Sequence, residues 1–144
     1  MLALRKEGED VWSTDVAVPM SRLPDIIEVS KTEMDELGLF ASILGHIGDG
    51  NFHESILYNS KDPKERAAVE KCIHDMVDRA LEMEGTCTGE HGIGLGKKDS
   101  LVKELGLETI GVMQSIKQSL DPYWLMNPGK IFSHPSANQS IKRH

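Results

Sequence analysis

The segment 45–54, GHIGDGNFHE, places two of the chain's six histidines, His46 and His53, on either side of Asp49-Gly50. An Asp-Gly pair between two runs of alternating hydrophobicity is among the strongest sequence signals for a tight hairpin turn. A two-residue turn would make His46 and His53 direct cross-strand neighbours, with Cβ atoms about 4.5–5.5 Å apart. Imidazoles at that separation can reach one metal ion at about 2.0–2.1 Å. The segment therefore predicts either half of a metal site or a solvated histidine pair.

A third ligand could come from the segment 85–97, GTCTGEHGIGLGK, in which Glu90 and His91 stand between Gly89 and Gly92. A loop that needed only flexibility would more often carry Ser, Asn or Lys at such positions. With Glu90 as the third ligand, two imidazoles and one carboxylate leave coordination positions open, as in catalytic metal sites. His91 would then point elsewhere, where an imidazole can act as an acid or a base near neutral pH.

These residues need strands and helices to position them. The turn at Asp49-Gly50 would direct Ile47 and Phe52 to the opposite face of the hairpin and into a core. The order of predicted elements indicates an α+β fold, with helices on one face of a small antiparallel sheet. Apolar and β-branched runs predict strands at 14–19, 39–47 and 51–59. Apolar residues at helical spacing predict helices at about 22–37, 63–84 and 107–120.

The composition of the chain argues against some classes of function. The chain has 144 residues, 39% hydrophobic and 27% charged, which is typical of one globular domain. Its formal net charge of −7 argues against electrostatic binding of nucleic acid. No run approaches the ~18 apolar residues of a membrane span. The first residues, MLAL, look like the end of a helix that begins earlier, so we expect the chain to be a fragment of a longer protein.

Three stretches in order, HIGDGNFH, TGEHGIGLGK and NPGKIF, resemble the C-terminal region of FAD-linked 2-hydroxyacid dehydrogenases of the vanillyl-alcohol-oxidase type. WSTDVAVPMSRLPDII is most similar to the D-lactate dehydrogenase (cytochrome) branch, especially its fungal mitochondrial members. In such enzymes an FAD-binding domain precedes a cap domain that covers the flavin. The resemblance implies that residues 1–132 are an N-terminally truncated cap domain without the FAD-binding domain, and that 133–144 are a loose tail.

The resemblance also implies a site and a reaction. A divalent metal, zinc or manganese, would be held by His46, His53 and Glu90, with His91 as the base and Asn127 near the flavin of FAD. The reaction would oxidise the 2-hydroxy acid D-lactate to pyruvate and pass the electrons to cytochrome c, in the mitochondrion.

Two alternatives stay open. The substrate could be glycolate or D-2-hydroxyglutarate, although the hydroxyglutarate branch tends to carry a lysine where this chain has Ser13. The chain could also be a metal-binding module that needs a separate FAD-carrying chain. In either case we expect the isolated chain to hold FAD poorly and to be inactive.

Overall fold

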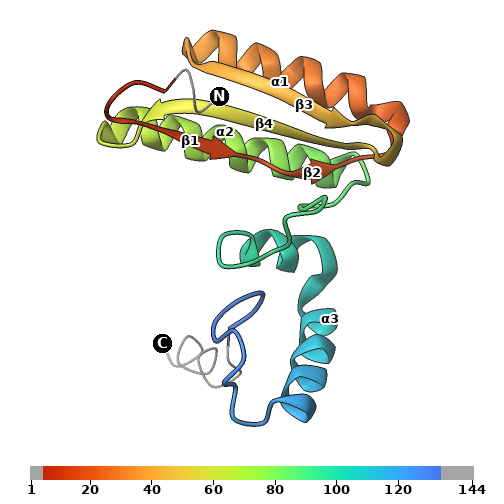
Figure 1. Cartoon of the computed structure of the whole chain (residues 1–144). Coiled ribbons are helices and arrows are strands. Elements are labelled where there is room, and N and C mark those ends of the chain that lie inside the picture. The colour runs from red at the N-terminus through yellow and green to blue at the C-terminus, as the bar shows by residue number, and fades with distance from the viewer. Residues whose placement is uncertain (1–4, 134–144) are drawn as a thin grey trace, which may run out of the picture. The chain divides into compact units, whose positions relative to one another are not determined.

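The computed structural model describes residues 5–133, which belong to two compact units, 1–91 and 92–144. The first unit is a four-stranded antiparallel sheet with two helices, and the second holds one further helix (Figure 1). The predicted α+β class is confirmed. The strands are β1 (Glu9–Ser13), β2 (Val16–Ala17), β3 (Phe40–His46) and β4 (Asn51–Asn59). The helices are α1 (Leu23–Leu37), α2 (Pro63–Glu82) and α3 (Lys98–Leu120).

Strand β4 is the centre of the sheet. It pairs with β3 along one edge, and with β1 and then β2 along the other. The strand predicted at 14–19 is therefore only the short β2, and the sequence analysis missed β1. Glu9 and Asp10 have low strand propensity, and β1 forms because it pairs with the end of β4.

The core of the first unit lies between one face of the sheet and helices α1 and α2. Met34 of α1 and Ile56 of β4 pack with Val69 and Ile73 of α2 in one buried cluster. Burying these apolar side chains is what holds both helices on the same face. The other face of the sheet is not covered by either helix, and His53 and Ser55 of β4 point to it.

The hairpin between β3 and β4 differs from the predicted one. A 3₁₀ turn at Ile47–Asp49 and the left-handed Gly50, with φ of 66°, make a four-residue connection. His46 therefore pairs with Asn51, and the predicted direct pairing with His53 is wrong. A two-residue type I′ turn needs positive φ at Asp49 as well as at Gly50, and Asp49 stays in the 3₁₀ turn.

The new register keeps the two histidines on one face, because alternate residues of a strand share a face. His53 pairs with Leu44, two residues before His46, so the histidines are diagonal neighbours. Phe52 is fully buried, as predicted, whereas Ile47 is 69% exposed in the turn and not in the core.

Helix α2 returns the chain to the sheet. It begins where predicted, at Asp62, whose side chain accepts hydrogen bonds from the backbone N–H groups of Lys64 and Glu65. After the helix, Thr86 pairs with Ala17 of β2 in an isolated antiparallel bridge. This bridge places the following glycine-rich segment beside the sheet.

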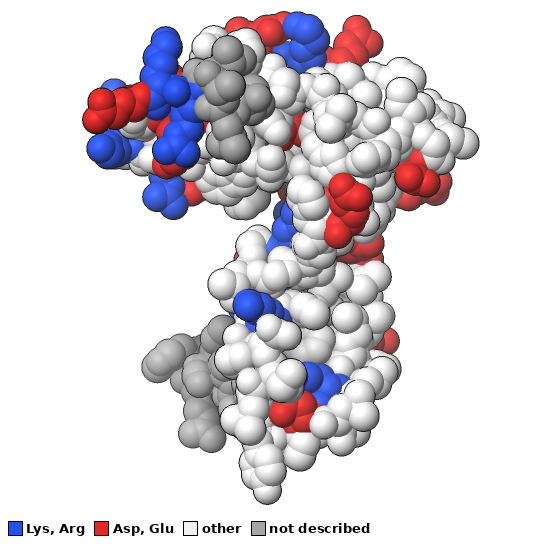
Figure 2. All heavy atoms as spheres, viewed as in Figure 1, with Lys and Arg blue, Asp and Glu red and all other residues white. Residues whose placement is uncertain are grey.

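The second unit is built on α3. Gly106, with φ of 77° and ψ of 159°, interrupts the helix, so the predicted helix at 107–120 is its second half. None of the helices in the described part of the chain has the length and apolarity to cross a membrane. In the view of Figure 2, Lys and Arg side chains stand beside Asp and Glu side chains and form no continuous basic track. Of the tail predicted at 133–144, all but Ser133 lies outside the described residues.

Candidate functional site

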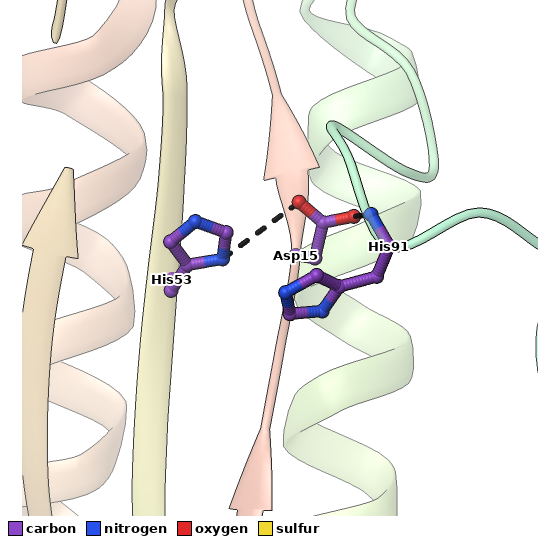
Figure 3. Close-up of side chains that lie close together, drawn as sticks. All are labelled: Asp15, His53 and His91. Carbon is purple, nitrogen blue, oxygen red and sulfur yellow. Dashed lines mark hydrogen bonds and ion pairs between the residues drawn. The ribbon is translucent and has the colours of Figure 1, made fainter. Parts of the chain in front are cut away.

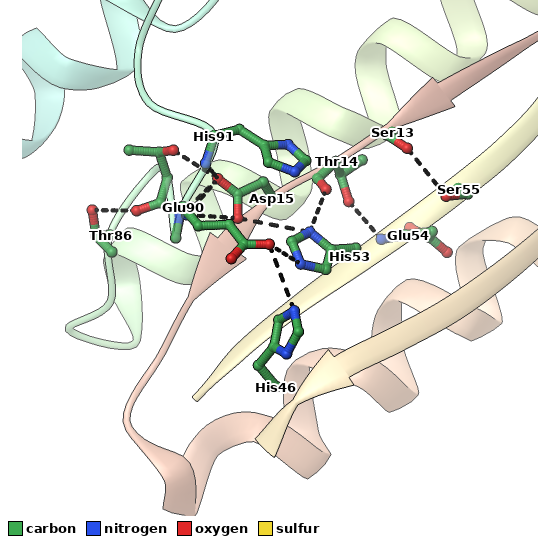
Figure 4. Close-up of polar contacts among 12 residues, drawn as sticks. Ser13, Thr14, Asp15, His46, His53, Glu54, Ser55, Thr86, Glu90 and His91 are labelled. Atoms are coloured by element: carbon green, nitrogen blue, oxygen red, sulfur yellow. Dashed lines mark hydrogen bonds and ion pairs between the residues drawn. The ribbon is translucent and has the colours of Figure 1, made fainter. Parts of the chain in front are cut away.

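The three predicted ligands come together on the sheet face opposite the helices. His46 ends β3, His53 lies in β4, and Glu90 comes from the glycine-rich segment (Figure 4). Oε1 of Glu90 lies 3.1 Å from Nε2 of His53 and 3.6 Å from Nε2 of His46. A tetrahedral ion with bonds of about 2.0–2.1 Å would separate its ligand atoms by about 3.3 Å. The three atoms therefore have the spacing of a shared coordination site.

The environment of His53 fits a metal ligand. Its Nδ1 lies 3.2 Å from the carbonyl oxygen of Thr14, which can only accept a hydrogen bond. The hydrogen of the neutral ring therefore sits on Nδ1, and the lone pair of Nε2 points at Oε1 of Glu90. Two acceptors at 3.1 Å repel each other unless a cation or a proton lies with them. A divalent metal satisfies both, and a carbonyl bond to the other ring nitrogen is the usual support of a metal-bound histidine.

Exposure differs across the cluster. The His53 side chain is only 11% exposed, whereas those of His46 and Glu90 are about half exposed. A metal here would be anchored on the buried ring and open on the other side. An open side is what a catalytic site requires for its substrate.

His91 lies next to this cluster. Its exposed ring stacks on that of His53, with centroids 5.0 Å apart and planes at 18° (Figure 3). One potential ligand atom from each of Asp15, His53 and His91 also falls within 4.8 Å of the others. Asp15 is a poor ligand, however, because its Oδ2 already accepts hydrogen bonds from four donors.

The sequence analysis did not assign Asp15 to the site. Its side chain is 1% exposed, and Oδ2 accepts hydrogen bonds from Oγ1 of Thr88 at 2.7 Å and from three successive backbone N–H groups. These come from Gly89 at 2.8 Å, Glu90 at 3.0 Å and His91 at 2.9 Å. Successive N–H groups that converge in this way form an anion-binding nest. The available signal was an acid directly before the apolar run VAVP (16–19), since a buried carboxylate needs partners.

Thr14 was also missed. Its N–H donates to the carbonyl of Glu54 at 2.8 Å, and its Oγ1 accepts from the Glu54 N–H at 2.8 Å. Together with its carbonyl contact to His53, these bonds fix the first residue after β1 against β4. Thr14 therefore sets the orientation of the His53 ring.

Gly89 explains why this segment is rich in glycine at this point. A Cβ atom here would lie 2.6 Å from Oδ1 of Asp15 and closer still to Oδ1 of Asn51. The backbone approaches the sheet so closely that only glycine fits.

Asn127, the predicted flavin neighbour, belongs to the second unit. It has a left-handed φ of 46°, and its carbonyl accepts the N–H of Lys130 at 3.2 Å. It forms part of the turn after α3, and its proximity to a flavin stays a prediction.

The chain is similar to known proteins over most of its length. The family model of FAD linked oxidases, C-terminal domain, matches residues 1–131. The chain is 49% identical over 130 residues to the mitochondrial D-lactate dehydrogenase (cytochrome) of Kluyveromyces lactis, and 47% identical over 124 residues to that of Arabidopsis thaliana. These matches cover 89% and 86% of this chain but only 22% of each relative.

More distant proteins match over a similar span. Glycolate oxidase subunit GlcD of Bacillus subtilis is 32% identical over 127 residues, which are 88% of this chain and 27% of that protein. The solved structure of 4-ethylphenol oxidase from Gulosibacter chungangensis, in complex with isoeugenol, has a TM-score of 0.61 at 18% identity. It aligns with 90% of this chain and 25% of its own, and the likeness is one of fold.

Proposed function

The chain belongs to the FAD linked oxidases, through their C-terminal domain, and from this membership we propose that it supplies the metal site and the catalytic base of a D-lactate dehydrogenase. The whole enzyme would oxidise D-lactate to pyruvate. The chain spans about a fifth of the length of the D-lactate dehydrogenases reported above, so the activity belongs to a longer or assembled protein.

One observation carries the metal site. Nε2 of His53 lies 3.1 Å from Oε1 of Glu90, and Nε2 of His46 lies 3.6 Å from the same oxygen. Two imidazoles and one carboxylate suit zinc or manganese. His46, His53 and Glu90 would hold that ion.

The proposed reaction removes a proton and a hydride from the substrate. When bound, the metal would act as a Lewis acid on the hydroxyl and carboxylate oxygens of the substrate, and FAD would take the hydride from its carbon. His91 would accept the hydroxyl proton on a ring nitrogen, which leaves the carbonyl of the 2-oxo acid. Its ring lies against that of His53, and so beside the proposed metal. Asn127 would contact the flavin from the second unit.

The sheet face beside the site favours a substrate with a single carboxylate. Ser13 and Ser55 pair across β1 and β4, with Oγ atoms 3.1 Å apart. They lie on the same face as His53, two residues along the strand. Hydroxyl groups here offer no positive charge to a second carboxylate, which favours D-lactate over D-2-hydroxyglutarate. The 49% identity to a D-lactate dehydrogenase, against 32% to the glycolate oxidase subunit, favours lactate over glycolate.

The proposals for the electron acceptor and the compartment rest on the relatives' names alone. The matched D-lactate dehydrogenases are called cytochrome-linked and mitochondrial. We propose cytochrome c as the acceptor and a mitochondrial location for the whole enzyme.

Metal binding by the purified chain tests the proposal. The wild type, dialysed against Zn²⁺ or Mn²⁺, should retain metal by elemental analysis, and His53→Ala should bind at least 10-fold more weakly. His74→Ala is the matched control, since His74 is exposed on α2. Equal metal content in the wild type and His53→Ala would reject the ligand assignment.

The substrate is tested on the Co²⁺-loaded chain, whose visible absorption bands report the coordination of the ion. D-Lactate, which can chelate through its hydroxyl and carboxylate, should shift these bands at lower concentration than propionate, which lacks the hydroxyl. Equal effects of the two acids would remove the argument for a 2-hydroxy acid.

A further inference from the structure

Asp15 accepts hydrogen bonds from three successive backbone N–H groups of the segment that presents Glu90 and His91 (Figure 4). We infer that Asp15 is a positioning residue: its carboxylate sets the conformation of segment 88–91, and through it the approach of Glu90 to His53. The inference rests on the proposed metal site for its consequence, whereas the contacts that carry it are those of the polypeptide itself.

Segment 88–91 has no regular secondary structure to hold it. It contains neither helix nor strand, and its last three N–H groups donate to Oδ2 of Asp15. The hydroxyl of Thr88 donates to the same oxygen. With one buried acceptor for four donors, the segment takes its shape from the carboxylate.

Asp15 and its neighbour Thr14 act on two different ligands. Thr14 holds the ring of His53 through its carbonyl oxygen, 3.2 Å from Nδ1. Asp15 holds the backbone of Glu90 at 3.0 Å, which brings the Glu90 carboxylate to the other ring nitrogen at 3.1 Å. Thr14 and Asp15, which lie between β1 and β2, thus hold the His53 ring and the Glu90 carboxylate at a fixed spacing.

Asp15 does not act as a ligand itself. Oδ2 is occupied by four donors, and Oδ1 lies 3.1 Å from the N–H of Glu90 and 3.7 Å from Nδ1 of His53. That nitrogen already faces the Thr14 carbonyl. The role of Asp15 is therefore exerted through segment 88–91.

Asp15→Asn is the sharpest test, because it keeps the size of the side chain and loses its charge. The amide oxygen can take the place of Oδ2, but it carries no charge, so the hydrogen bonds from its four donors weaken. The amide N–H₂ group would then face the N–H of Glu90 at the position of Oδ1. We expect affinity for Co²⁺ to fall about 10- to 100-fold, as when the outer partner of a metal ligand is removed. The visible bands of bound Co²⁺ should also change shape, because Glu90 is displaced.

Asp62→Asn is the matched control. Asp62 also accepts two backbone N–H bonds, at the start of α2, and it contacts none of the proposed ligands. It should lower the melting temperature without changing the affinity for Co²⁺ or the bands. If Asp15→Asn stays folded and matches the wild type in both, or if Asp62→Asn changes them equally, the inference is wrong.

Amide exchange measured by NMR on the metal-free wild type keeps the test decisive if Asp15→Asn does not fold. The N–H groups of Gly89, Glu90 and His91 should be as protected as those in β4. Exchange at the rate of a free loop would overturn the inference. Protected amides in a chain that binds no metal would support the inference and reject the proposed function.

Discussion

Nε2 of His53 and Oε1 of Glu90 lie 3.1 Å apart, and both are acceptors once Nδ1 of His53 has donated to the Thr14 carbonyl. This contact is favourable around a metal ion or a shared proton, and it is unfavourable when neither is present. The metal-free and metal-bound chains should therefore respond in opposite directions to the loss of the Glu90 charge.

Glu90→Gln tests that opposition. The amide group can donate a hydrogen bond to Nε2 of His53, so in EDTA the melting temperature should be equal to or above that of the wild type. Zn²⁺ binding, measured by competition with a chelating dye, should weaken at least 10-fold, because a neutral amide replaces a carboxylate ligand. Glu36→Gln, an exposed change on α1, should alter neither. Unchanged Zn²⁺ affinity in Glu90→Gln would remove Glu90 from the site.

Gly89→Ala should disrupt the site by steric overlap. The added methyl group would lie 2.6 Å from Oδ1 of Asp15, so segment 88–91 must move away from the sheet. We expect metal affinity to fall at least 10-fold and the free energy of unfolding to drop by about 1–3 kcal/mol. Gly96→Ala serves as the control, since a methyl group at that position would have no atom within 4 Å beyond its chain neighbours. Equal metal affinities of the two variants would contradict the close approach.

The sequence predicted which residues cluster better than it predicted how they are arranged. His46, His53 and Glu90 do come together, because the two histidines point to the sheet face opposite the helices and the glycine-rich segment brings Glu90 to the same face. The register was wrong, since an Asp-Gly pair is compatible with a two-residue turn and with a longer loop that has only Gly50 left-handed. Local sequence cannot choose between these turns. The choice depends on packing around Gly50, whose N–H and carbonyl bond to Ile47 and Val18.

Long-range partners explain what the sequence analysis missed. Asp15 is a site residue only because α2 returns the chain beside β2, and its partners are more than seventy residues away. Strand β1 likewise depends on pairing with β4. Neither contact leaves a periodic pattern in the sequence, whereas the helices and β4 do.

Glu54 should make stability depend on pH. Burial raises the pKa of its carboxyl from 4.5 to about 7, with the charge of nearby Glu33 adding to the shift. Since the pKa is higher in the folded state, its contribution to stability is complete below pH 4.5 and is lost as the pH rises through 7. The loss is at most about 3 kcal/mol.

Chemical unfolding in EDTA at pH 5 and pH 8 measures this term. Glu54 is 1% exposed and points to the helix face of the sheet. Glu54→Gln should therefore reduce the difference in the free energy of unfolding between pH 5 and pH 8. Exposed Glu36→Gln should retain it. A Glu54→Gln profile parallel to that of the wild type would show that the slope comes from other groups.

The open face of the sheet should promote association of the isolated chain. Phe40 and Leu44 of β3 are 55% and 67% exposed, although such side chains are usually covered. Replacing both by Gln should shift sedimentation toward the monomer. Leu107 and Leu120 of α3 are similarly exposed, and the same double change there provides the comparison. A shift only in the α3 variant would show that the sheet face does not self-associate.

The site should hold one metal ion. The two possible ligand groups share His53, whose Nδ1 faces the Thr14 carbonyl, and Oδ2 of Asp15 already accepts hydrogen bonds from four donors. Only Nε2 of His53 remains, and it points at Glu90. Elemental analysis of the saturated chain should therefore give about one ion per chain. His91→Ala should keep that ratio and bind Zn²⁺ within about twofold of the wild type, whereas His46→Ala should bind at least 10-fold more weakly. Two ions per chain, or metal loss in His91→Ala, would mean that the ring stacked on His53 is itself a ligand and cannot be the free base.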